Sequence, residues 1–241
     1  MGPARALLAL AADLLCPERC AACIALVAAD ELFCHACRAR VNVLGSPECV
    51  RCGHPRRNAG TCATCSDSTD RPIRYARAFA AYHGSEGRGP VAEALAAFKY
   101  AGVQRLGRRL ASAMLTRLPA EPPDVVVPIP LHPRRLRQRG YNQSAVLARQ
   151  IARGLGVRAA LGLLVRVRDT RSQTALTSLE RAVNVAGAFA VDRPGELHDR
   201  SILLVDDVWT SGATARAAAT ALSDAGAGAV DVLTFARVLA D

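Results

Sequence analysis

The chain has 241 residues with 51% hydrophobic and 22% charged side chains, a composition typical of globular proteins that excludes general disorder. No apolar run reaches the roughly 18 residues needed to cross a bilayer, so we expect no membrane span. Arginine carries nearly all of the formal net charge of +10, because Lys99 is the only lysine. This charge fits either a polyanionic partner or a basic, solvated surface.

An apolar segment, ALLALAADLLC, lies near the start of the chain and is interrupted by Asp13. We expect an amphipathic helix here rather than a secretory signal peptide, because the apolar run is short. With no convincing export signal, the protein is predicted to be cytoplasmic.

Cysteine is confined to residues 16–65, and eight of the nine cysteines form four C-x-x-C pairs. A disulfide framework would need an oxidising compartment and would leave one thiol over, so zinc explains the spacing better than disulfide or redox-active pairs. Two such turns complete a tetrahedral site of four thiolates. We therefore predict two consecutive zinc ribbons, although an interleaved pairing would use the same cysteines. The predicted ligands are Cys20, Cys23, Cys34 and Cys37 in the first site and Cys49, Cys52, Cys62 and Cys65 in the second.

A site closed by four thiolates has no open coordination position, so both zinc ions are expected to be structural rather than catalytic. Cys16 lies outside the pattern and is interpreted as a small core residue. His35 and His54 are interpreted as neighbours of the sites and not as ligands.

The composition changes after Cys65, where the polar, proline-ended segment SDSTDRP (66–72) is typical of a linker. We place the domain boundary here, with a double zinc ribbon domain at 1–68 and a second domain at 72–241. In the second domain strands and helices alternate, which predicts an α/β fold with a mainly parallel sheet and flanking helices. The expected strands are 77–83, 124–129, 163–167, 201–207 and 229–238, and the expected helices are 91–100, 104–118, 142–155, 177–185 and 213–225.

Residues 201–214, SILLVDDVWTSGAT, place two adjacent carboxylates, Asp206 and Asp207, between an apolar strand and a hydroxyl-rich turn. In parallel sheets, ligands bind beyond the carboxyl ends of the strands, where helix N-termini point. Main-chain N–H groups of 210–214 would converge on a phosphate, while the carboxylates would accept from ribose hydroxyls or face a hydrated Mg²⁺. The stretch therefore predicts a site for a sugar phosphate with vicinal hydroxyls.

This stretch resembles the phosphoribosyl pyrophosphate (PRPP) motif of type I phosphoribosyltransferases. Residues 125–143, VVVPIPLHPRRLRQRGYNQ, resemble the hallmark of the ComF family of competence-associated, amidophosphoribosyltransferase-like proteins. LAAFKYAG (95–102) and RVRDTRSQTALTSLERAVNVAGAF (166–189) match that family too, and the cysteine-rich start resembles its double zinc ribbon. The resemblance covers nearly the whole chain and implies a type I phosphoribosyltransferase fold.

The resemblance also implies a function, the Mg²⁺-dependent transfer of phosphoribose from PRPP to an acceptor that no residue identifies. It implies that Asp206 and Asp207 bind the ribose hydroxyls, the following turn the 5′-phosphate, and residues 130–135 the pyrophosphate. The catalytic candidates are Asp206, Asp207 and Arg168. The candidates for PRPP binding are Asp206, Asp207, Thr210, Ser211, Gly212, Ala213, Thr214, Arg134, Arg135 and Lys99.

The alternative function is that of a DNA-uptake accessory protein that binds single-stranded DNA and other competence or DNA-processing proteins, with PRPP as effector or relic. Aromatic residues make up only 4% of the chain, so a DNA grip would be mainly electrostatic. The candidates for DNA or anion binding are Arg134, Arg135, Arg137, Arg139 and Arg171. The first four are equally explained as the solvent-exposed face of a short helix between Pro133 and Gly140.

Other residues near these motifs have two interpretations. Asn142 and Gln143 fit either ligand contacts or helix capping, with Asn142 as the expected N-cap of the helix at 142–155. His132 fits either a contact with the arginine loop or one with ligand. Trp209 stands where type I enzymes commonly have a smaller or aliphatic residue. Three residues of the last family-like stretch fit either ligand contacts or a loop anchor and capping residues: Gln173, Arg181 and Asn184.

Overall fold

The computed structural model describes residues 17–66, 72–82, 89–100, 104–118, 121–169 and 178–239. Four sequence predictions lie outside these residues: the N-terminal helix, Cys16, Arg171 and Gln173. For Arg181 only the backbone is described. None of the helices in the described ranges has the length and apolar character that a bilayer crossing demands.

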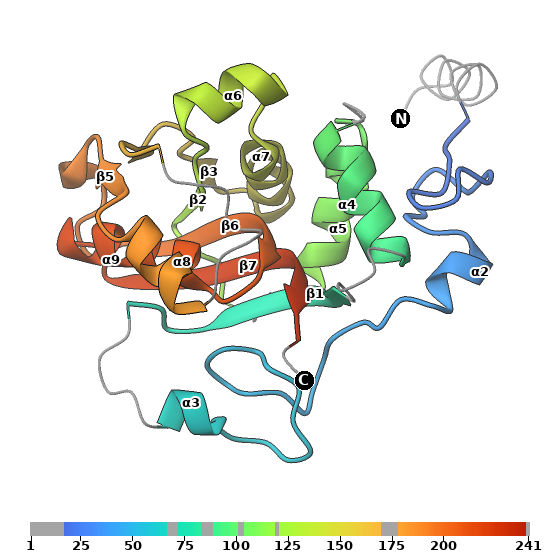
Figure 1. Ribbon diagram of the computed structural model, residues 1–241, viewed down its shortest axis with the longest axis horizontal. Coiled ribbons are helices and arrows are strands. Elements are labelled where there is room, and N and C mark those ends of the chain that lie inside the picture. The colour runs from blue at the N-terminus through green and yellow to red at the C-terminus, as the bar shows by residue number, and fades with distance from the viewer. Residues whose placement is uncertain are drawn as a thin grey trace.

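A five-stranded sheet in the order β1-β7-β6-β2-β3 forms the centre of the molecule (Figure 1). Every neighbouring pair in it is parallel. The predicted α/β fold with a mainly parallel sheet is therefore confirmed. The strands are β1 (Ala76–Tyr82), β2 (Val125–Pro128), β3 (Arg158–Ala159), β6 (Ser201–Trp209) and β7 (Ala229–Val238).

The central strands are apolar on both sides because helices cover both faces of the sheet. In β6, Leu203 and Val205 belong to one core cluster, whereas Ile202 and Leu204 belong to the other. Helices α4, α5 and α7 pack over the first cluster, and α9 packs over the second. The helices are α4 (Pro90–Tyr100), α5 (Leu106–Leu115), α6 (Pro133–Arg139), α7 (Gln143–Leu155), α8 (Ser178–Val185) and α9 (Ala213–Asp224), with a 3-10 turn, η2 (Pro194–Glu196).

Local capping signals explain where these helices begin and end. The side chain of Asn142 accepts a hydrogen bond from the main-chain N–H of Ser144, so Asn142 is the N-cap of α7 as predicted. Gly140 adopts a left-handed conformation with φ 80° and ends the short helix α6 that Pro133 begins.

The predicted strand at 163–167 exists but does not join the main sheet. It is β4 (Leu164–Arg166), which pairs antiparallel with β5 (Phe189–Val191) in a separate two-stranded sheet. Neither β5 nor β3 was predicted. They have three and two residues, respectively, and such short strands show no recognisable alternation of apolar and polar residues. The strand expected to end at Asp207 instead continues to Trp209.

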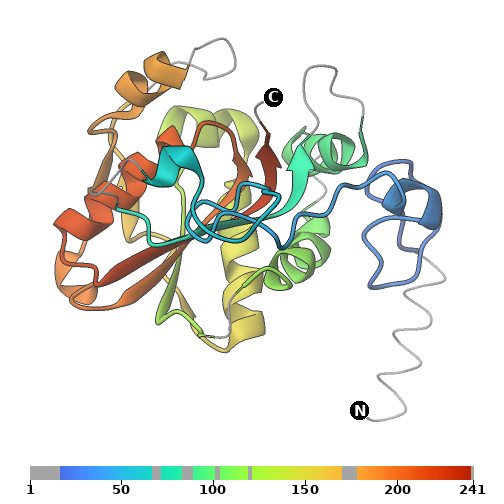
Figure 2. The ribbon, with the colours of Figure 1, turned by 90° about the horizontal axis from the view of Figure 1, so that it is seen from below.

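The cysteine-rich segment forms two ribbons, the first ribbon (17–41, with α2 His35–Arg38) and the second ribbon (45–66, with α3 Ala63–Ser66). Figures 1 and 2 show the first ribbon beside α4 and α5 at one end of the molecule, and the second ribbon along the β1 edge of the sheet. Leu44, between the two ribbons, packs on Ala78 and Ala81 of β1. The placement of the domain boundary near residues 68–72 stays a prediction.

Candidate functional site

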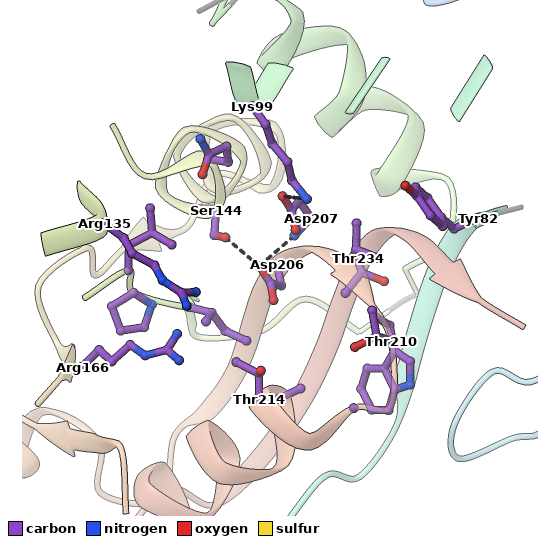
Figure 3. A pocket seen from close by; sticks show the side chains of 18 of the residues that line it. Tyr82, Lys99, Arg135, Ser144, Arg166, Asp206, Asp207, Thr210, Thr214 and Thr234 are labelled. Carbon is purple, nitrogen blue, oxygen red and sulfur yellow. Dashed lines mark hydrogen bonds and ion pairs between the residues drawn. The ribbon is translucent and has the colours of Figure 1, made fainter. Parts of the chain in front are cut away.

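The connections of the sheet diverge between β2 and β6. From β2 the chain proceeds to β3 at one edge, and from β6 it proceeds to β7 on the other side. Crevices at such a switch point are the usual ligand sites of open α/β sheets. A cavity of about 500 Å³ lies here, lined by the ends of β2 and β6 and by the N-terminal turns of α7 and α9 (Figure 3).

Asp206 and Asp207 lie next to each other near the end of β6, and both line this cavity. Oδ1 of Asp206 accepts hydrogen bonds from the hydroxyl of Ser144 at 2.8 Å and from the main-chain N–H of Asp207 at 2.9 Å. Burial, together with the neighbouring Asp207 carboxylate, raises the pKa of Asp206 to about 7. The pair therefore holds a carboxyl group that changes charge near neutral pH.

Lys99 reaches the carboxylates from α4, with Nζ 2.8 Å from Oδ2 of Asp207. Burial lowers the pKa of Lys99, but the Asp207 carboxylate outweighs this effect and holds the pKa above its usual value. Lys99 is therefore charged, and the structure brings this predicted residue into the cavity with both aspartates.

The turn after β6 leads into α9 with Gly212 as N-cap, in the left-handed conformation at φ 76°. A Cβ atom at Gly212 would lie 2.3 Å from Cζ2 of Trp209, so only glycine fits. The N–H groups of the first turn of a twelve-residue helix point toward this end, which favours an anion there. Of the predicted turn residues, Thr210, Gly212 and Thr214 line the cavity, whereas Ala213 is buried and Ser211 lines a second cavity beside the second ribbon.

The arginines of α6 divide into two pairs. Arg135 and Arg139 line the cavity, and Arg139 donates to Oε1 of Gln143 at 3.1 Å. Arg134 is 69% exposed and lies 3.5 Å from Asp169, and Arg137 is exposed outside the cavity lining. The division follows from helix geometry, because residues three or four apart share a face.

Arg168 does not line the cavity, because its guanidinium group donates to the carbonyl of Ala186 at 2.6 Å. Arg166, two residues earlier on β4, lines the cavity instead and lies over the ring of Phe189, 5.4 Å from the ring centre. Sequence reasoning missed Arg166, although it begins the family-like stretch at 166–189. With Lys99, Arg135 and Arg139, it gives four cationic side chains against two carboxylates among the described residues of the lining.

Other polar residues of the lining were also missed or left open. Ser144 escaped notice, although its position just after the N-cap places it at the start of α7. Gln143 lines the cavity, while Asn142 caps α7 and donates from Nδ2 to the carbonyl of Ile129 at 3.1 Å. His132 caps α6 and lies 3.4 Å from Asp169, outside the lining.

The cysteines form the two predicted quartets. The ligand atoms of Cys20, Cys23, Cys34 and Cys37, and those of Cys49, Cys52, Cys62 and Cys65, each lie within 4.8 Å of one another. The interleaved pairing is therefore excluded.

The geometry of each quartet fits zinc. The Sγ atoms of Cys23 and Cys34 are 3.6 Å apart, and those of Cys52 and Cys62 are 3.7 Å apart. Zn–S bonds of about 2.3 Å in a tetrahedron place sulfurs about 3.8 Å apart. Burial raises the pKa of Cys20 and of Cys49, but main-chain N–H donors outweigh it and lower each to about 6. The described part of the chain thus contains two zinc sites of four cysteines each, and neither His35 nor His54 belongs to them.

Comparison with known proteins supports the same organisation. Residues 11–66 match the double zinc ribbon domain family. Competence protein F of Haemophilus influenzae is 33% identical over 116 residues, and DNA utilization protein YhgH of Escherichia coli K12 is 36% identical over 117 residues. Each alignment covers 48% of this chain and 51% of the relative, so the chain matches about half the length of these two proteins.

Competence protein ComFC of Bacillus subtilis is 27% identical over 217 residues, which are 86% of this chain and 85% of that protein. The chain is a homologue of the ComF, ComFC and YhgH proteins. Among solved structures, this chain is similar to glutamine phosphoribosylpyrophosphate amidotransferase of B. subtilis in complex with ADP and GMP. That alignment has a TM-score of 0.35 and 25% identity, and it covers 54% of this chain and 25% of the other.

Proposed function

We propose that the cavity at the β2–β6 switch point binds PRPP with Mg²⁺ and that the protein transfers phosphoribose to an acceptor. The observation that carries this proposal is the position of Asp206 and Asp207. They lie at the end of β6, just before the turn that leads into the N-terminus of α9, and they share one cavity with four cationic side chains. Carboxylates accept hydrogen bonds from vicinal ribose hydroxyls, and the N–H groups at the helix N-terminus donate to a 5′-phosphate.

Figure 3 shows Arg135 and Arg166 on one side of Asp206 and Thr210 on the other. Arg135 lies in the helix that follows β2, Arg139 ends that helix, and Arg166 ends β4. A pyrophosphate on C1 of a ribose held over Asp206 would face these groups. Transfer breaks the bond between C1 and the pyrophosphate oxygen, the electron pair leaves with pyrophosphate, and the acceptor forms the new bond to C1. Fixed cations that stabilise the departing charge lower the barrier of such a step.

The protein side of the cavity offers too few oxygens for a dedicated magnesium cage. Among the described residues, Asp206 and Asp207 are the only carboxylates in its lining, and one oxygen of Asp207 is paired with Lys99. Such a donor set fits Mg²⁺ that keeps several waters and is bound mainly by substrate phosphates. Bound in this way, Mg²⁺ would supply charge to the leaving pyrophosphate. Asp206 and Asp207 would hold its water shell and the ribose hydroxyls.

Isothermal titration calorimetry with PRPP in the presence and absence of Mg²⁺ tests the binding step. Ribose 5-phosphate and pyrophosphate are the matched partial ligands, because each fills one side of the cavity. We expect PRPP with Mg²⁺ to bind more tightly than either partial ligand. Equal weak binding of all three would refute the sugar-phosphate assignment.

A second candidate function is binding of single-stranded DNA in the cytoplasm, in association with other competence or DNA-processing proteins. One observation favours it: Tyr100 is 75% exposed at the cavity mouth, and Arg139 lies over its ring, 5.2 Å from the centre. An exposed aromatic ring beside arginines is the usual platform for a base and its phosphate. The names of the relatives, which refer to competence and DNA utilization, agree with this role. Competition between PRPP and an oligonucleotide would show whether the two functions share the cavity.

A further inference from the structure

Trp209 forms a wall between two cavities. On one side is the proposed PRPP cavity, and on the other is a cavity of about 170 Å³ between the sheet and the second ribbon. Trp209, Thr210 and Val238 line both. The position of this indole ring therefore depends on what packs against it from the ribbon side.

Arg237 holds the ring from that side. It is the partner of Trp209 in the β6–β7 register, and its guanidinium carbon lies 5.3 Å from the centre of the indole ring. The same guanidinium group donates to the carbonyl of Cys52, a ligand of the second zinc site. Arg237 therefore contacts both the zinc-binding loop and the tryptophan.

Two further arginines line the smaller cavity, and each donates to a carbonyl of its own segment. Arg51 of the second ribbon donates to the carbonyl of Cys65 at 3.4 Å, and Arg216 of α9 donates to the carbonyl of Ser211 at 2.8 Å. Each guanidinium group is thus bound to a main-chain carbonyl of the ribbon or of the turn. The cavity lies at the joint between these two segments, and Arg237 connects the ribbon to the strand beside the turn.

The indole ring also fixes the turn that contains Gly212, which is proposed to bind the phosphate. The ring lies so close to Gly212 that an added Cβ would meet Cζ2 and Cε2 of Trp209 at 2.3 and 2.7 Å. A displaced ring would therefore release the left-handed Gly212, which sets the direction of the first N–H groups of α9.

The first ribbon has no such connection to the turn among the described residues. It is attached to α4 and α5 by apolar packing, for example of Phe33, and by Arg109 of α5, which is buried, donates to the carbonyls of Arg19 and Glu31 and pairs with Glu18 at 3.0 Å. Figures 1 and 2 show this ribbon at the end of the molecule beyond α4 and α5. The two zinc sites thus stabilise different parts of the protein.

We propose that the second zinc ribbon is a structural part of the PRPP site, and that Arg237 is a positioning residue that couples it to the phosphate turn through Trp209. Occupancy of the second zinc site then sets the affinity for PRPP, whereas occupancy of the first does not. This inference takes its ligand, PRPP, from the proposed function, but the coupling between the second ribbon and the turn does not depend on that function. Trp209 is the only tryptophan of the chain, so its fluorescence reports the joint directly.

The test compares Cys62→Ser and Arg237→Met with two matched controls on the first ribbon, Cys23→Ser and Arg109→Met. Zinc content is measured by elemental analysis, folding is checked by circular dichroism, and Trp209 emission and PRPP affinity are measured on each full-length variant.

We expect Cys62→Ser to lose one zinc ion. We expect both Cys62→Ser and Arg237→Met to shift Trp209 emission to longer wavelength. We expect PRPP binding to weaken about five- to thirtyfold in these two variants, which spans the loss of a cation–π contact from an exposed to a desolvated site. Arg237→Lys should recover part of both effects, and both controls should match the wild type in Trp209 emission and PRPP affinity.

Unchanged emission in Cys62→Ser and Arg237→Met would overturn the proposal, and so would an equal shift in the two controls. If Cys62→Ser does not fold, Arg237→Met, which keeps both zinc sites, decides alone. If the wild type does not bind PRPP at all, the proposed function fails, while the emission of Trp209 still tests the coupling.

Discussion

The ammonium group of Lys99 lies 2.8 Å from Oδ2 of Asp207, and this ion pair joins α4 to the end of β6 across the candidate site. The two side chains are only 22% and 13% exposed. Because both charged groups are largely shielded from water, each is stabilised mainly by the opposite charge of the other. The site thus contains an internal counter-ion for the carboxylate that is proposed to face PRPP.

Breaking this pair should cost more than breaking an exposed one. We expect Lys99→Met and Asp207→Asn each to lower the free energy of unfolding by about 1–3 kcal/mol, because each leaves a poorly hydrated charge. The double variant should lose less than the sum of the two. Urea unfolding measures all three, with Arg108→Met as control, since Arg108 pairs with Asp30 at 58% and 88% exposure. Additive losses would show that the two groups do not depend on each other.

The pKa of Asp206 predicts a pH dependence of stability. Burial and the Asp207 carboxylate raise this pKa from the usual 3.8 to about 7 in the folded protein. Ionisation of Asp206 therefore destabilises the fold, with no cost below about pH 4 and the full cost above about pH 7. Asp206→Asn removes this cost, so its advantage in unfolding free energy should grow by about 2 kcal/mol between pH 5.5 and 8.

Unfolding measured in urea at these two pH values checks the growth. Asp224→Asn, at an exposed position, is the control variant. In the same range PRPP affinity of the wild type should rise with pH, because the ionised carboxylate is the better acceptor for ribose hydroxyls. A flat difference for Asp206→Asn would contradict the raised pKa.

Elemental analysis should find about two zinc ions per chain, because each cysteine quartet is a closed tetrahedral site. Cys34→Ser and Cys49→Ser should each retain one. Cys16→Ser should retain both, since Cys16 belongs to neither predicted quartet. A single zinc ion in the wild type would mean that one quartet does not bind metal.

The two arginine pairs of α6 should separate PRPP binding from DNA binding. Arg135→Ala with Arg139→Ala should weaken PRPP binding about tenfold or more, because both side chains line the cavity. Arg134→Ala with Arg137→Ala should leave PRPP binding unchanged. If α6 also binds single-stranded DNA, the second double variant should reduce the slope of log affinity against log salt by about 0.7 for each phosphate that the variant no longer binds. Titrations at several salt concentrations measure both, and an equal effect of the two pairs on PRPP would be inconsistent with the observed division.

Asn142 makes two hydrogen bonds that can be removed separately. Asn142→Ala should lower the free energy of unfolding by about 1–2 kcal/mol, since it removes the α7 cap and the bond to the Ile129 carbonyl. Asn142→Asp keeps the capping acceptor and removes only the donor, so its stability should lie between. Chemical denaturation ranks the three proteins, and an Asp variant no better than Ala would show that the bond to Ile129 is the decisive one.

Much of this protein follows from local sequence signals. The C-x-x-C spacing predicted both zinc sites, because four thiolates in two tight turns meet one ion whatever the rest of the chain does. Long periodic segments predicted the main helices and strands to within a few residues. The polar residues at the end of β6 and in the turn after it predicted Asp206, Asp207, Thr210, Gly212 and Thr214 as cavity residues. Short elements such as β3 and β5 escaped, because two or three residues contain no readable period.

Only the tertiary structure decided which cations share the site. Arg166 and Arg168 are alike in sequence, yet one faces the cavity and the other a main-chain carbonyl, because β4 belongs to the small antiparallel sheet beside the site. The contact between Arg237 and Trp209 likewise depends on the β6–β7 register and on where the second ribbon packs. A sequence specifies local geometry through neighbours along the chain. Contacts between residues far apart in sequence arise only when the sheet order brings strand ends and ribbons to the same place.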